Sequence, residues 1–174
     1  AVNQDVPEYA WLISQGEYDR ALGVILARNP MPGVTGYVCT HLCETRCTRN
    51  DYEEPVAIRV LKRYAVEHGH ANLVASAKKS SGHRAAVIGS GPSGLSAAAF
   101  LALNGVDVTV YEAKAHVGGM LRMIPSFRLP AEIIQEDVDR ITALGVKIKT
   151  LHPIDHAPEE LLQEGFDAVY VAAG

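Results

Sequence analysis

The clearest chemical motif of the chain is the sequence Gly-Ser-Gly-Pro-Ser-Gly, which has the glycine-x-glycine-x-x-glycine pattern of nucleotide-binding turns. Gly89 permits a tight turn, Gly91 lets the backbone approach a pyrophosphate, and Gly94 lets a helix pack closely against a strand. The anion would meet unpaired N–H groups and the positive end of the helix dipole. An apolar run at 85–89 and an alanine-rich run at 92–103 predict the strand and the helix that this chemistry needs.

A carboxylate and a second glycine pair extend this motif. Glu112 ends the predicted strand 107–111, where it can accept hydrogen bonds from both hydroxyls of an adenosine ribose and would repel a 2′-phosphate. The pair Gly118-Gly119 would let the backbone approach the diphosphate or ribitol of a longer dinucleotide. This extension is typical of FAD sites and unusual in NAD sites, so we predict FAD, with NAD as the alternative. Glycines that only form turns would explain one of these positions, but not five with an acid at a working distance.

Three cysteines, Cys39, Cys43 and Cys47, lie close enough in sequence to hold a metal. Thiolates select iron–sulfur clusters, zinc or copper(I), and an iron–sulfur cluster needs four ligands, so these three would leave it incomplete. Zinc sites more often use C-x2-C pairs, and only His41 is nearby as a fourth ligand. From the spacing alone an iron–sulfur cluster is favoured, while zinc and plain buried thiols stay open. The odd cysteine count argues against a disulfide framework.

The elements that must position these residues change type along the chain. Helices are predicted at 7–13, 17–28 and from Pro55 to about 68, and the sequence Asn-Pro-Met-Pro-Gly at 29–33 is expected to forbid helix. From residue 85 onward strands and helices alternate, which implies a parallel sheet. The further strands are expected at 107–111, 146–150 and 167–173, and the helices at 92–103, 131–144 and 158–163.

The apolar spacing within the helices predicts which side chains are buried. One stripe contains Ala21, Leu22, Ile25 and Leu26; a second contains Ala57, Val60, Leu61 and Tyr64; a third contains Ile134, Val138 and Ile141. The predicted architecture is α plus α/β, with a helical domain at 1–75, a small, polar linker at 76–84 and a Rossmann-like domain with a parallel sheet at 85–174.

Composition excludes several classes of protein. Hydrophobic residues make up 48% of the chain and charged residues 21%, which is ordinary for a soluble globular protein. The net charge of −4 offers no broad basic field for nucleic acid, and no apolar run is long enough to span a membrane. The polar start is not a signal peptide, and we therefore expect a cytoplasmic protein in a reducing compartment.

The motifs together resemble those of the small (β) subunit of NADPH-dependent glutamate synthase and of the amino-terminal part of dihydropyrimidine dehydrogenase. The resemblance covers nearly all 174 residues, and its motifs follow in the same order. They are N-Q-D-V-P-E-Y at 3–9, N-P-x-P at 29–32, G-Y-V-C-x3-C-E-x2-C at 36–47, E-P-V-A-I at 54–58, G-S-G-P-S-G-L at 89–95, E-A at 112–113, G-G-M-L at 118–121 and I-P-S-F-R-L-P at 124–130.

The resemblance implies a helical domain with two [4Fe–4S] clusters, followed by an FAD domain that an NADPH domain interrupts. Electrons would pass from NADPH to FAD and then through the clusters to a partner site. By position, Cys39 and Cys43 would ligate one cluster and Cys47 the other. The residues implied for FAD are Val38 near the flavin, Ser90, Gly91, Pro92, Ser93 and Gly94 at the pyrophosphate, Glu112 at the ribose, and Gly118, Gly119, Met120 and Arg128 at further contacts.

The chain also departs from the family pattern. The cysteine-rich segment that supplies the remaining cluster ligands in the family is missing, and Thr35 stands where some relatives have a further cysteine. Lys62 lies near a position where dihydropyrimidine dehydrogenase uses a glutamine ligand, and an ammonium group has no lone pair to donate. The chain stops inside the FAD domain, so we expect a piece of a longer subunit, truncated in its FAD domain and inactive alone.

We therefore expect part of a flavoprotein oxidoreductase that passes electrons from NAD(P)H through FAD to iron–sulfur clusters and a partner subunit. The cofactor would carry the redox chemistry, and no catalytic acid or base is expected in this piece. Two alternatives stay open at this point. One is a flavin-free docking module of a redox complex, and the other is an NAD-dependent dehydrogenase domain.

Overall fold

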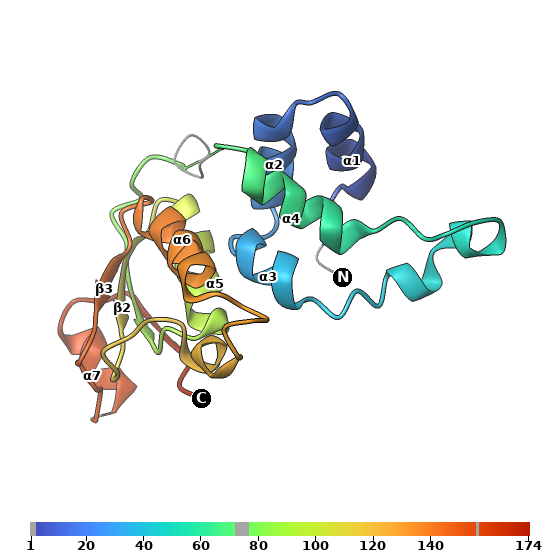
Figure 1. The fold of residues 1–174 in the computed structure, drawn as a ribbon. Helices are drawn as coiled ribbons and strands as arrows, with labels where there is room; N and C mark the ends of the chain where they lie inside the picture. The colour runs from blue at the N-terminus through green and yellow to red at the C-terminus, as the bar shows by residue number, and fades with distance from the viewer. Residues whose placement is uncertain (1–2, 72–76, 156) are drawn as a thin grey trace. The chain divides into compact units, whose positions relative to one another are not determined.

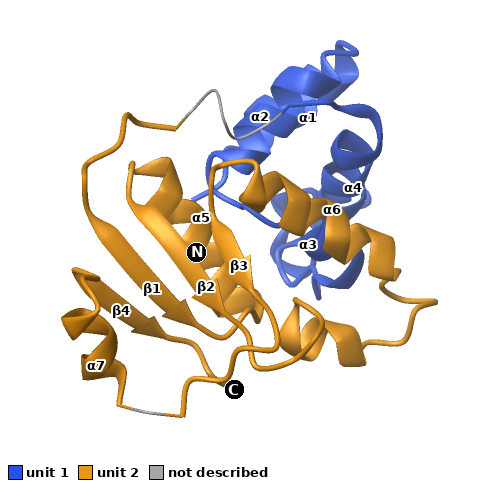
Figure 2. Cartoon of the chain, turned by 90° about the vertical axis from the view of Figure 1, so that its left-hand side faces the viewer, with its two compact units in different colours: residues 1–72 blue, residues 73–174 orange. Residues whose placement is uncertain are grey.

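The computed structural model describes residues 3–71, 77–155 and 157–174. The chain divides into two compact units, residues 1–72 and 73–174 (Figure 2). The first unit is helical, and the second contains a parallel sheet with helices on its faces. The predicted fold class, a helical region followed by a Rossmann-like α/β domain, is confirmed.

The first unit is built from helices α1 (Val6–Ser14), α2 (Tyr18–Leu26), α3 (Pro32–Val38) and α4 (Ile58–His68), with the 3-10 turns η1 (Glu44–Arg46) and η2 (Thr48–Asp51) between the last two. Helix α1 begins where the side chain of Asp5 accepts a hydrogen bond from the backbone N–H of Glu8 at 3.1 Å. The core joins α1, α2 and α4, and its fully buried members are Tyr9, Leu12, Ala21, Ile25 and Ala65. The predicted buried stripe of α2 is confirmed in full.

Two expectations for the first unit were wrong. Helix α3 begins at Pro32, inside the segment expected to forbid helix, because proline at the first helical position lacks an N–H that would be unpaired there anyway. The buried face of α4 contains Lys62, Ala65 and Val66. The predicted stripe was different, since Val60 is 56% exposed and Tyr64 is 38% exposed.

The second unit has a four-stranded sheet in the order β3-β2-β1-β4, with every pair parallel. Its strands are β1 (Arg84–Ile88), β2 (Asp107–Tyr111), β3 (Lys147–Lys149) and β4 (Ala168–Val171); its helices are α5 (Pro92–Leu103), α6 (Ala131–Thr142) and α7 (Pro158–Gln163), with a 3-10 turn η4 (Gly119–Met123). Helices α5 and α6 lie on one face of the sheet and α7 lies on the other (Figures 1 and 2).

Each face of this sheet has its own apolar core. On the face of α5 and α6, fully buried members include Val87, Val110, Leu95, Ile134 and Ile141, and each buried aliphatic side chain of this size stabilises the fold by about 1.5–3 kcal/mol. The predicted inward stripe of α6 is therefore confirmed. On the opposite face the cluster contains Ala86, Tyr111, Leu161 and Phe166. These two cores fix the strands in the sheet, so the residues that follow the carboxyl ends of β1 and β2 are held close to one another.

The described part of the segment predicted as a linker is hydrogen-bonded to the second unit. The backbone N–H of Lys78 donates to the carbonyl of Leu103 at 2.9 Å, and that of Ser81 donates to the carbonyl of Gly105 at 2.8 Å. Arg84, the last residue of the predicted linker, already opens β1. Residue 76 lies outside the described residues.

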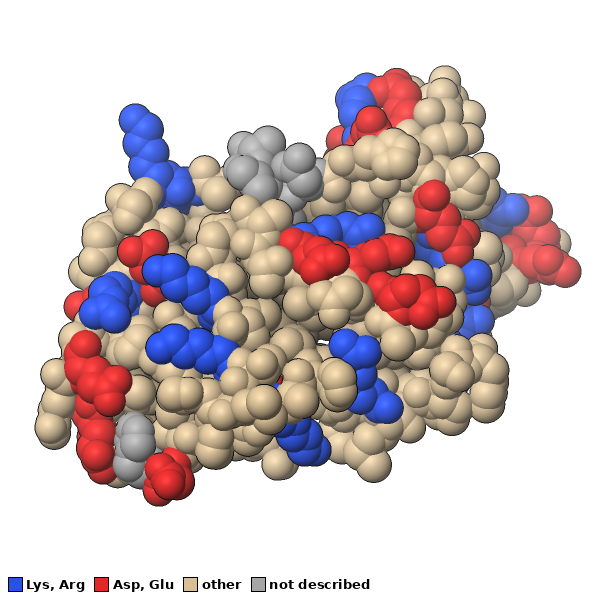
Figure 3. Space-filling view, turned by 60° about the vertical axis from the view of Figure 1, so that its left-hand side comes forward, with Lys and Arg blue, Asp and Glu red and all other residues tan. Residues whose placement is uncertain are grey.

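Two observations concern the surface. Among the described residues, no helix is long and apolar enough to cross a membrane. On the face of the molecule drawn in Figure 3, lysine and arginine side chains are interspersed with aspartate and glutamate, and no continuous basic field forms there.

Candidate functional site

The carboxyl ends of β1 and β2 bring the two halves of the glycine motif together. Ile88 is the register partner of Tyr111, so the turn that follows β1 lies beside Glu112, which follows β2. One oxygen of Glu112, Oε2, accepts hydrogen bonds from the backbone N–H of Ser90 at 2.9 Å and from the Ser90 hydroxyl. The other, Oε1, accepts from the backbone N–H of Lys114 at 2.8 Å. The side chain expected to bind a ribose is thus hydrogen-bonded to the turn at residues 89–94, which we call the phosphate loop because it is expected to bind a pyrophosphate.

The ionisation of Glu112 follows from these bonds. The residue is only 7% exposed, and burial raises the pKa of its carboxyl group. Hydrogen bonds from Ser90 and Lys114 act in the opposite direction and prevail, so the pKa lies below its ordinary value. Glu112 is therefore a carboxylate at neutral pH, which can accept hydrogen bonds but cannot donate them.

The three glycines of the first motif do different work. A Cβ atom on Gly89, whose φ is +100°, would lie 2.6 Å from the carbonyl oxygen of Ala172, and one on Gly94 would lie 2.0 Å from the carbonyl oxygen of Gly89. These two positions require glycine because the backbone itself is crowded there. A Cβ atom on Gly91 would meet no heavy atom within 4 Å. Gly91 therefore presents open backbone where an anion can approach, as the FAD interpretation requires.

Helix α5 begins directly at this open position. Gly91 is its N-cap residue, Pro92 is its first residue, and no side chain caps the end. The free N–H groups and the helix dipole therefore face the space beside Gly91. The hydroxyl of Ser93 lies 2.9 Å from the hydroxyl of Tyr170 on β4, which leaves Ser93 at the rim of the same loop.

The second glycine pair packs against the first motif through its backbone. The N–H of Gly118 donates to the carbonyl oxygen of Ser90 at 3.0 Å and approaches the Ser90 hydroxyl at 3.3 Å. A Cβ atom on Gly119, whose φ is +52°, would lie 2.9 Å from the Cα atom of Gly91. The structure thus brings Ser90, Gly91, Glu112, Gly118 and Gly119 into one site.

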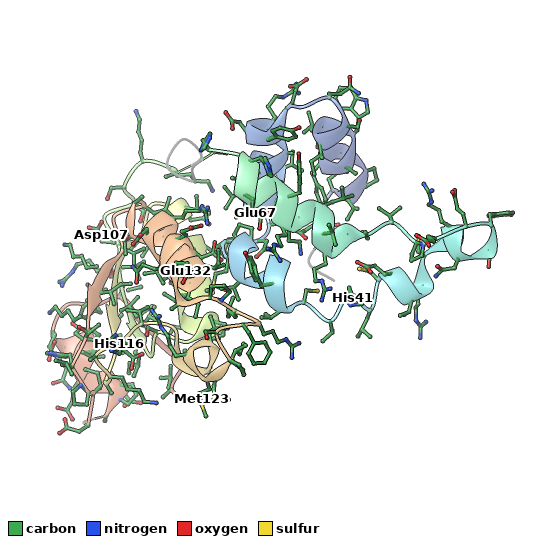
Figure 4. All side chains as sticks on the ribbon, in the orientation of Figure 1. His41, Glu67, Asp107, His116, Met123 and Glu132 are labelled. Carbon is green, nitrogen blue, oxygen red and sulfur yellow. The ribbon has the colours of Figure 1, made fainter. Side chains whose placement is uncertain are left out.

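Three other predicted FAD residues are not gathered there. Met120 belongs to η4 and is 68% exposed, and Met123 of the same turn is exposed as well (Figure 4). Arg128 is exposed, and among the described residues its side chain has no hydrogen-bonding partner. Val38 ends α3 in the other unit. Their contacts with a flavin therefore stay predictions.

The three cysteines lie at the ends of short elements of the first unit. Cys39 is the C-cap residue of α3, and Cys43 and Cys47 flank η1. All three thiols are free, and Cys43 is exposed. Within the described ranges, no three or more His, Cys, Asp or Glu side chains are arranged as a metal site. His41, on the segment after α3 (Figure 4), has its Nδ1 atom 3.2 Å from Oε2 of Glu44, so it is already engaged.

Two buried polar groups near these cysteines were missed by reasoning from the sequence. The hydroxyl of Tyr9 is buried and has no hydrogen-bonding partner in the described structure. Its pKa is raised to about 12, chiefly by burial and further by negative charge at Cys43 and Cys39. Lys62 is 7% exposed, and in the described part of the chain no side chain forms an ion pair with it. Burial lowers the pKa of Lys62, while negative charge at Cys39 and Cys43 opposes that shift.

These two groups indicate the kind of occupant that the cysteine loop fits. An unpaired buried hydroxyl is costly, and burial of Lys62 disfavours its charged form, so an anion beside the cysteines would be a favourable partner for both groups. Iron–sulfur clusters bound by thiolates carry net negative charge, so the residues around Cys39 and Cys43 fit such a cluster. The signal in the sequence was a lysine four residues after Ile58 and four before Val66, on one face of α4, but Lys62 was interpreted only as a missing ligand.

Comparison with known proteins follows the same division of the chain. Residues 1–74 match the family described as dihydropyrimidine dehydrogenase domain II, 4Fe-4S cluster, and residues 87–135 match the NAD(P)-binding Rossmann-like domain family. YgfK of Escherichia coli (strain K12), named as an oxidoreductase, is 42% identical over 179 residues, which cover 100% of this chain and 17% of YgfK.

Two further relatives carry more specific names. The β subunit of NADP(+)-dependent formate dehydrogenase from Moorella thermoacetica is 38% identical over 98% of this chain and 28% of its own length. The small chain of NADPH glutamate synthase from Bacillus subtilis (strain 168) is 34% identical over 97% of this chain and 35% of its own length. The chain thus spans about a sixth to about a third of these relatives.

Proposed function

Residues 1–74 belong to the dihydropyrimidine dehydrogenase 4Fe-4S domain family and residues 87–135 to the NAD(P)-binding Rossmann-like family, and on that premise we propose that this chain holds FAD beside iron–sulfur clusters in an NAD(P)H-dependent oxidoreductase subunit. Electrons pass from NAD(P)H to FAD and then through the clusters to a partner site. The cluster-binding region lies within residues 1–75 and the FAD-binding region within residues 85–174; the segment 76–84 joins them, and its described part packs with the second unit.

The single observation that carries the FAD assignment is the grouping of Gly91, Glu112 and the Gly118-Gly119 pair at the carboxyl ends of β1 and β2. The open backbone at Gly91 and the uncapped start of α5 bind the pyrophosphate, with Ser90, Pro92, Ser93 and the outer glycines of the motif shaping the loop. The ionised carboxylate of Glu112 accepts a hydrogen bond from the adenosine ribose.

The remaining predicted residues extend this site. Met120 and Arg128 continue the FAD contact from η4 and from the loop that follows it, and Val38 lies near the flavin. Bound FAD supplies the exchange between two-electron hydride chemistry and one-electron transfer. The chain itself binds and orients the cofactor, and none of its side chains is proposed to move a proton during the reaction.

The cluster assignment is supported by the unpaired hydroxyl of Tyr9 and by the position of Lys62 in the first unit. Cys39 and Cys43 ligate one [4Fe–4S] cluster and Cys47 ligates the other, with the remaining ligands supplied from outside these three cysteines. The buried ammonium group of Lys62 and the hydroxyl of Tyr9 then donate toward the anionic cluster or its cysteine sulfur atoms. Lys62 does not ligate iron as an ammonium group, since an ammonium group has no lone pair.

The relatives support a partner subunit. The formate dehydrogenase and glutamate synthase relatives are named as a β subunit and a small chain, respectively, so each is one component of a larger enzyme. By analogy, the terminal acceptor of this protein lies on another subunit or domain. A flavin-free docking module is the second candidate. The segment 39–47, which contains the three cysteines, is compatible with it because Cys43 is exposed and could face a partner.

One experiment separates these functions. The absorption spectrum of anaerobically purified chain is recorded, and any nucleotide is released by heat and identified. FAD in near-equal amount to protein is expected, and Glu112→Ala should reduce it strongly, whereas Glu132→Gln, an exposed carboxylate of the same unit (Figure 4), should not. Broad absorbance near 400 nm that bleaches with dithionite would report a cluster. A colourless chain that also fails to bind added FAD would contradict the FAD assignment and favour the docking module.

A further inference from the structure

The side chain of Ser90 connects three parts of the proposed site. Ser90 is fully buried, so its hydroxyl bonds only to protein. The hydroxyl contacts Oε2 of Glu112, and the backbone N–H of Gly118 approaches it at 3.3 Å. The phosphate loop, the ribose-binding acid and the second glycine turn therefore meet at one oxygen atom.

The direction of both hydrogen bonds can be derived. A backbone N–H can only donate, so the Ser90 oxygen accepts from Gly118. An ionised carboxylate can only accept, so the Ser90 hydroxyl donates its single proton to Glu112. The single donor of the hydroxyl is thus used by Glu112, and this bond holds one rotamer of the acid.

The acceptor capacity of Glu112 limits what else it can bind. An ionised carboxylate offers about four lone-pair positions. Oε2 accepts two hydrogen bonds from Ser90, and Oε1 accepts one from Lys114. One acceptor position is left on Oε1, which differs from the expectation that Glu112 receives both hydroxyls of the ribose.

We infer that Ser90 is a positioning residue for the proposed FAD site, which holds Glu112 so that Oε1 receives only one hydroxyl of the adenosine ribose. The inference rests on the proposed function, because the ribose belongs to the FAD assigned there. Ser90 acts through Glu112, because its own side chain is fully buried and cannot contact a ligand. Loss of its hydroxyl would free the carboxylate to rotate, so that neither ribose hydroxyl would have an acceptor held in place for it and the two hydroxyls would become equivalent.

The test measures binding of adenosine nucleotides to the chain by calorimetry. ADP, 2′-deoxy-ADP and 3′-deoxy-ADP serve as probes of the ribose contact, and FAD is titrated in parallel. For the wild-type chain, removal of one ribose hydroxyl should weaken binding by on the order of tenfold, the effect of one hydrogen bond to a charged group, and removal of the other should leave it unchanged. For Ser90→Ala, FAD should bind more weakly, and the difference between the two deoxy analogues should shrink.

Ser81→Ala is the matched control. Its hydroxyl donates to the carbonyl oxygen of Gly105 at 3.0 Å in the same unit, so the variant also loses one serine hydrogen bond. It should keep wild-type affinity and the wild-type preference between the analogues. A general loss of structure would weaken the binding of all three probes by the same factor and leave the preference between the two deoxy analogues unchanged. Loss of the Ser90 hydroxyl alone should instead reduce that preference.

The outcomes separate the inference from the proposed function. Equal weakening by the two deoxy analogues in the wild-type chain would overturn the single-hydroxyl inference while leaving FAD binding in place. Because this arm needs no variant, it holds even where Ser90→Ala does not fold. Failure of the wild-type chain to bind both ADP and FAD would overturn the proposed FAD site, and the role of Ser90 with it.

Discussion

A Cβ atom on Gly119 would lie 2.9 Å from the Cα atom of Gly91, so the two glycine turns of the site touch through backbone alone. This contact explains why the second glycine pair is needed even before any ligand is considered. Gly119 is therefore needed for packing, whereas a Cβ atom on Gly91 would enter open space where a ligand can bind.

Gly119→Ala should destabilise the second unit by roughly 1–3 kcal/mol, because the new methyl group forces the two turns apart and φ at this position is +52°. Chemical denaturation measures the loss. Gly145→Ala is the control, since Gly145 also has positive φ, +92°, but a Cβ atom there meets nothing within 4 Å. Equal losses in the two variants would show that backbone strain alone accounts for the effect.

Gly91→Ala should leave the free energy of unfolding within about 0.5 kcal/mol of the wild type, because its Cβ atom would enter open space. The same methyl group would occupy the position where the pyrophosphate approaches, so affinity for FAD should fall more than tenfold. Gly94→Ala provides the contrast: its Cβ atom would lie 2.0 Å from the carbonyl oxygen of Gly89, and the fold itself should be lost. Retained FAD affinity in Gly91→Ala would place the pyrophosphate elsewhere.

Glu112 should make stability depend on pH in the acid range. Its pKa in the folded state is lowered from 4.5, so the unfolded chain binds the proton more tightly. The stabilisation is therefore present above about 4.5 and disappears as the pH falls through the folded pKa. The difference in unfolding free energy between wild type and Glu112→Gln should shrink over that interval. The corresponding difference for Glu132→Gln should stay flat.

Tyr9→Phe should leave the cluster-free chain as stable as the wild type or about 1 kcal/mol more stable, because the lost hydroxyl is buried without a partner. Thermal unfolding of the metal-free chain measures this. Leu12→Ala, at a neighbouring position of the same core, should cost about 2–5 kcal/mol. Clear destabilisation by Tyr9→Phe would mean that the hydroxyl has a protein partner.

Lys62→Met should stabilise the cluster-free chain by on the order of 1 kcal/mol, since burial disfavours the charged form of Lys62 and no ion pair holds it among the described residues. In cluster-loaded protein the same change should lower the reduction potential, because a nearby positive charge favours the reduced cluster. Arg63→Met is the control on the same helix: Arg63 is exposed and pairs with Glu67 (Figure 4) at 2.6 Å, and its loss should change neither quantity appreciably. An unchanged potential in Lys62→Met would remove Lys62 from the cluster environment.

Much of the second unit could be predicted from its sequence, because local signals there agree with the global fold. The strand at 107–111 and the helices at 92–103 and 158–163 have the expected boundaries. The strand is covered on both faces and the helices pack against the sheet, so the apolar residues of these segments are also the buried ones. The 3-10 turn at Gly119–Met123 was not expected, since its conformation depends on the contact between Gly119 and Gly91.

The first unit was harder to predict because its exceptions depend on tertiary environment. Pro32 was interpreted as a helix breaker, although the side chain of Asn29 accepts from the N–H of Met31 at 3.2 Å and donates to the hydroxyl of Thr35 at 2.6 Å, which supports the start of α3. Lys62 was considered only as an unsuitable cluster ligand, and its place on the buried face of α4 was not predicted. The role of the Ser90 hydroxyl could not be predicted either, because the rotamer of Glu112 depends on three separate segments.

The pairing of β1 with β4 has a consequence for how the protein matures during synthesis. Ala85 pairs with Ala168, and the carbonyl oxygen of Ala172 lies where any side chain on Gly89 would have to go. The conformation of the phosphate loop therefore depends on backbone contacts with β4 and Ala172, which are translated more than eighty codons later. Contacts of such long sequence separation close late in folding. A nascent chain that has emerged only as far as the loop carries the full glycine motif, yet the loop can take the described conformation only after β4 has left the ribosome.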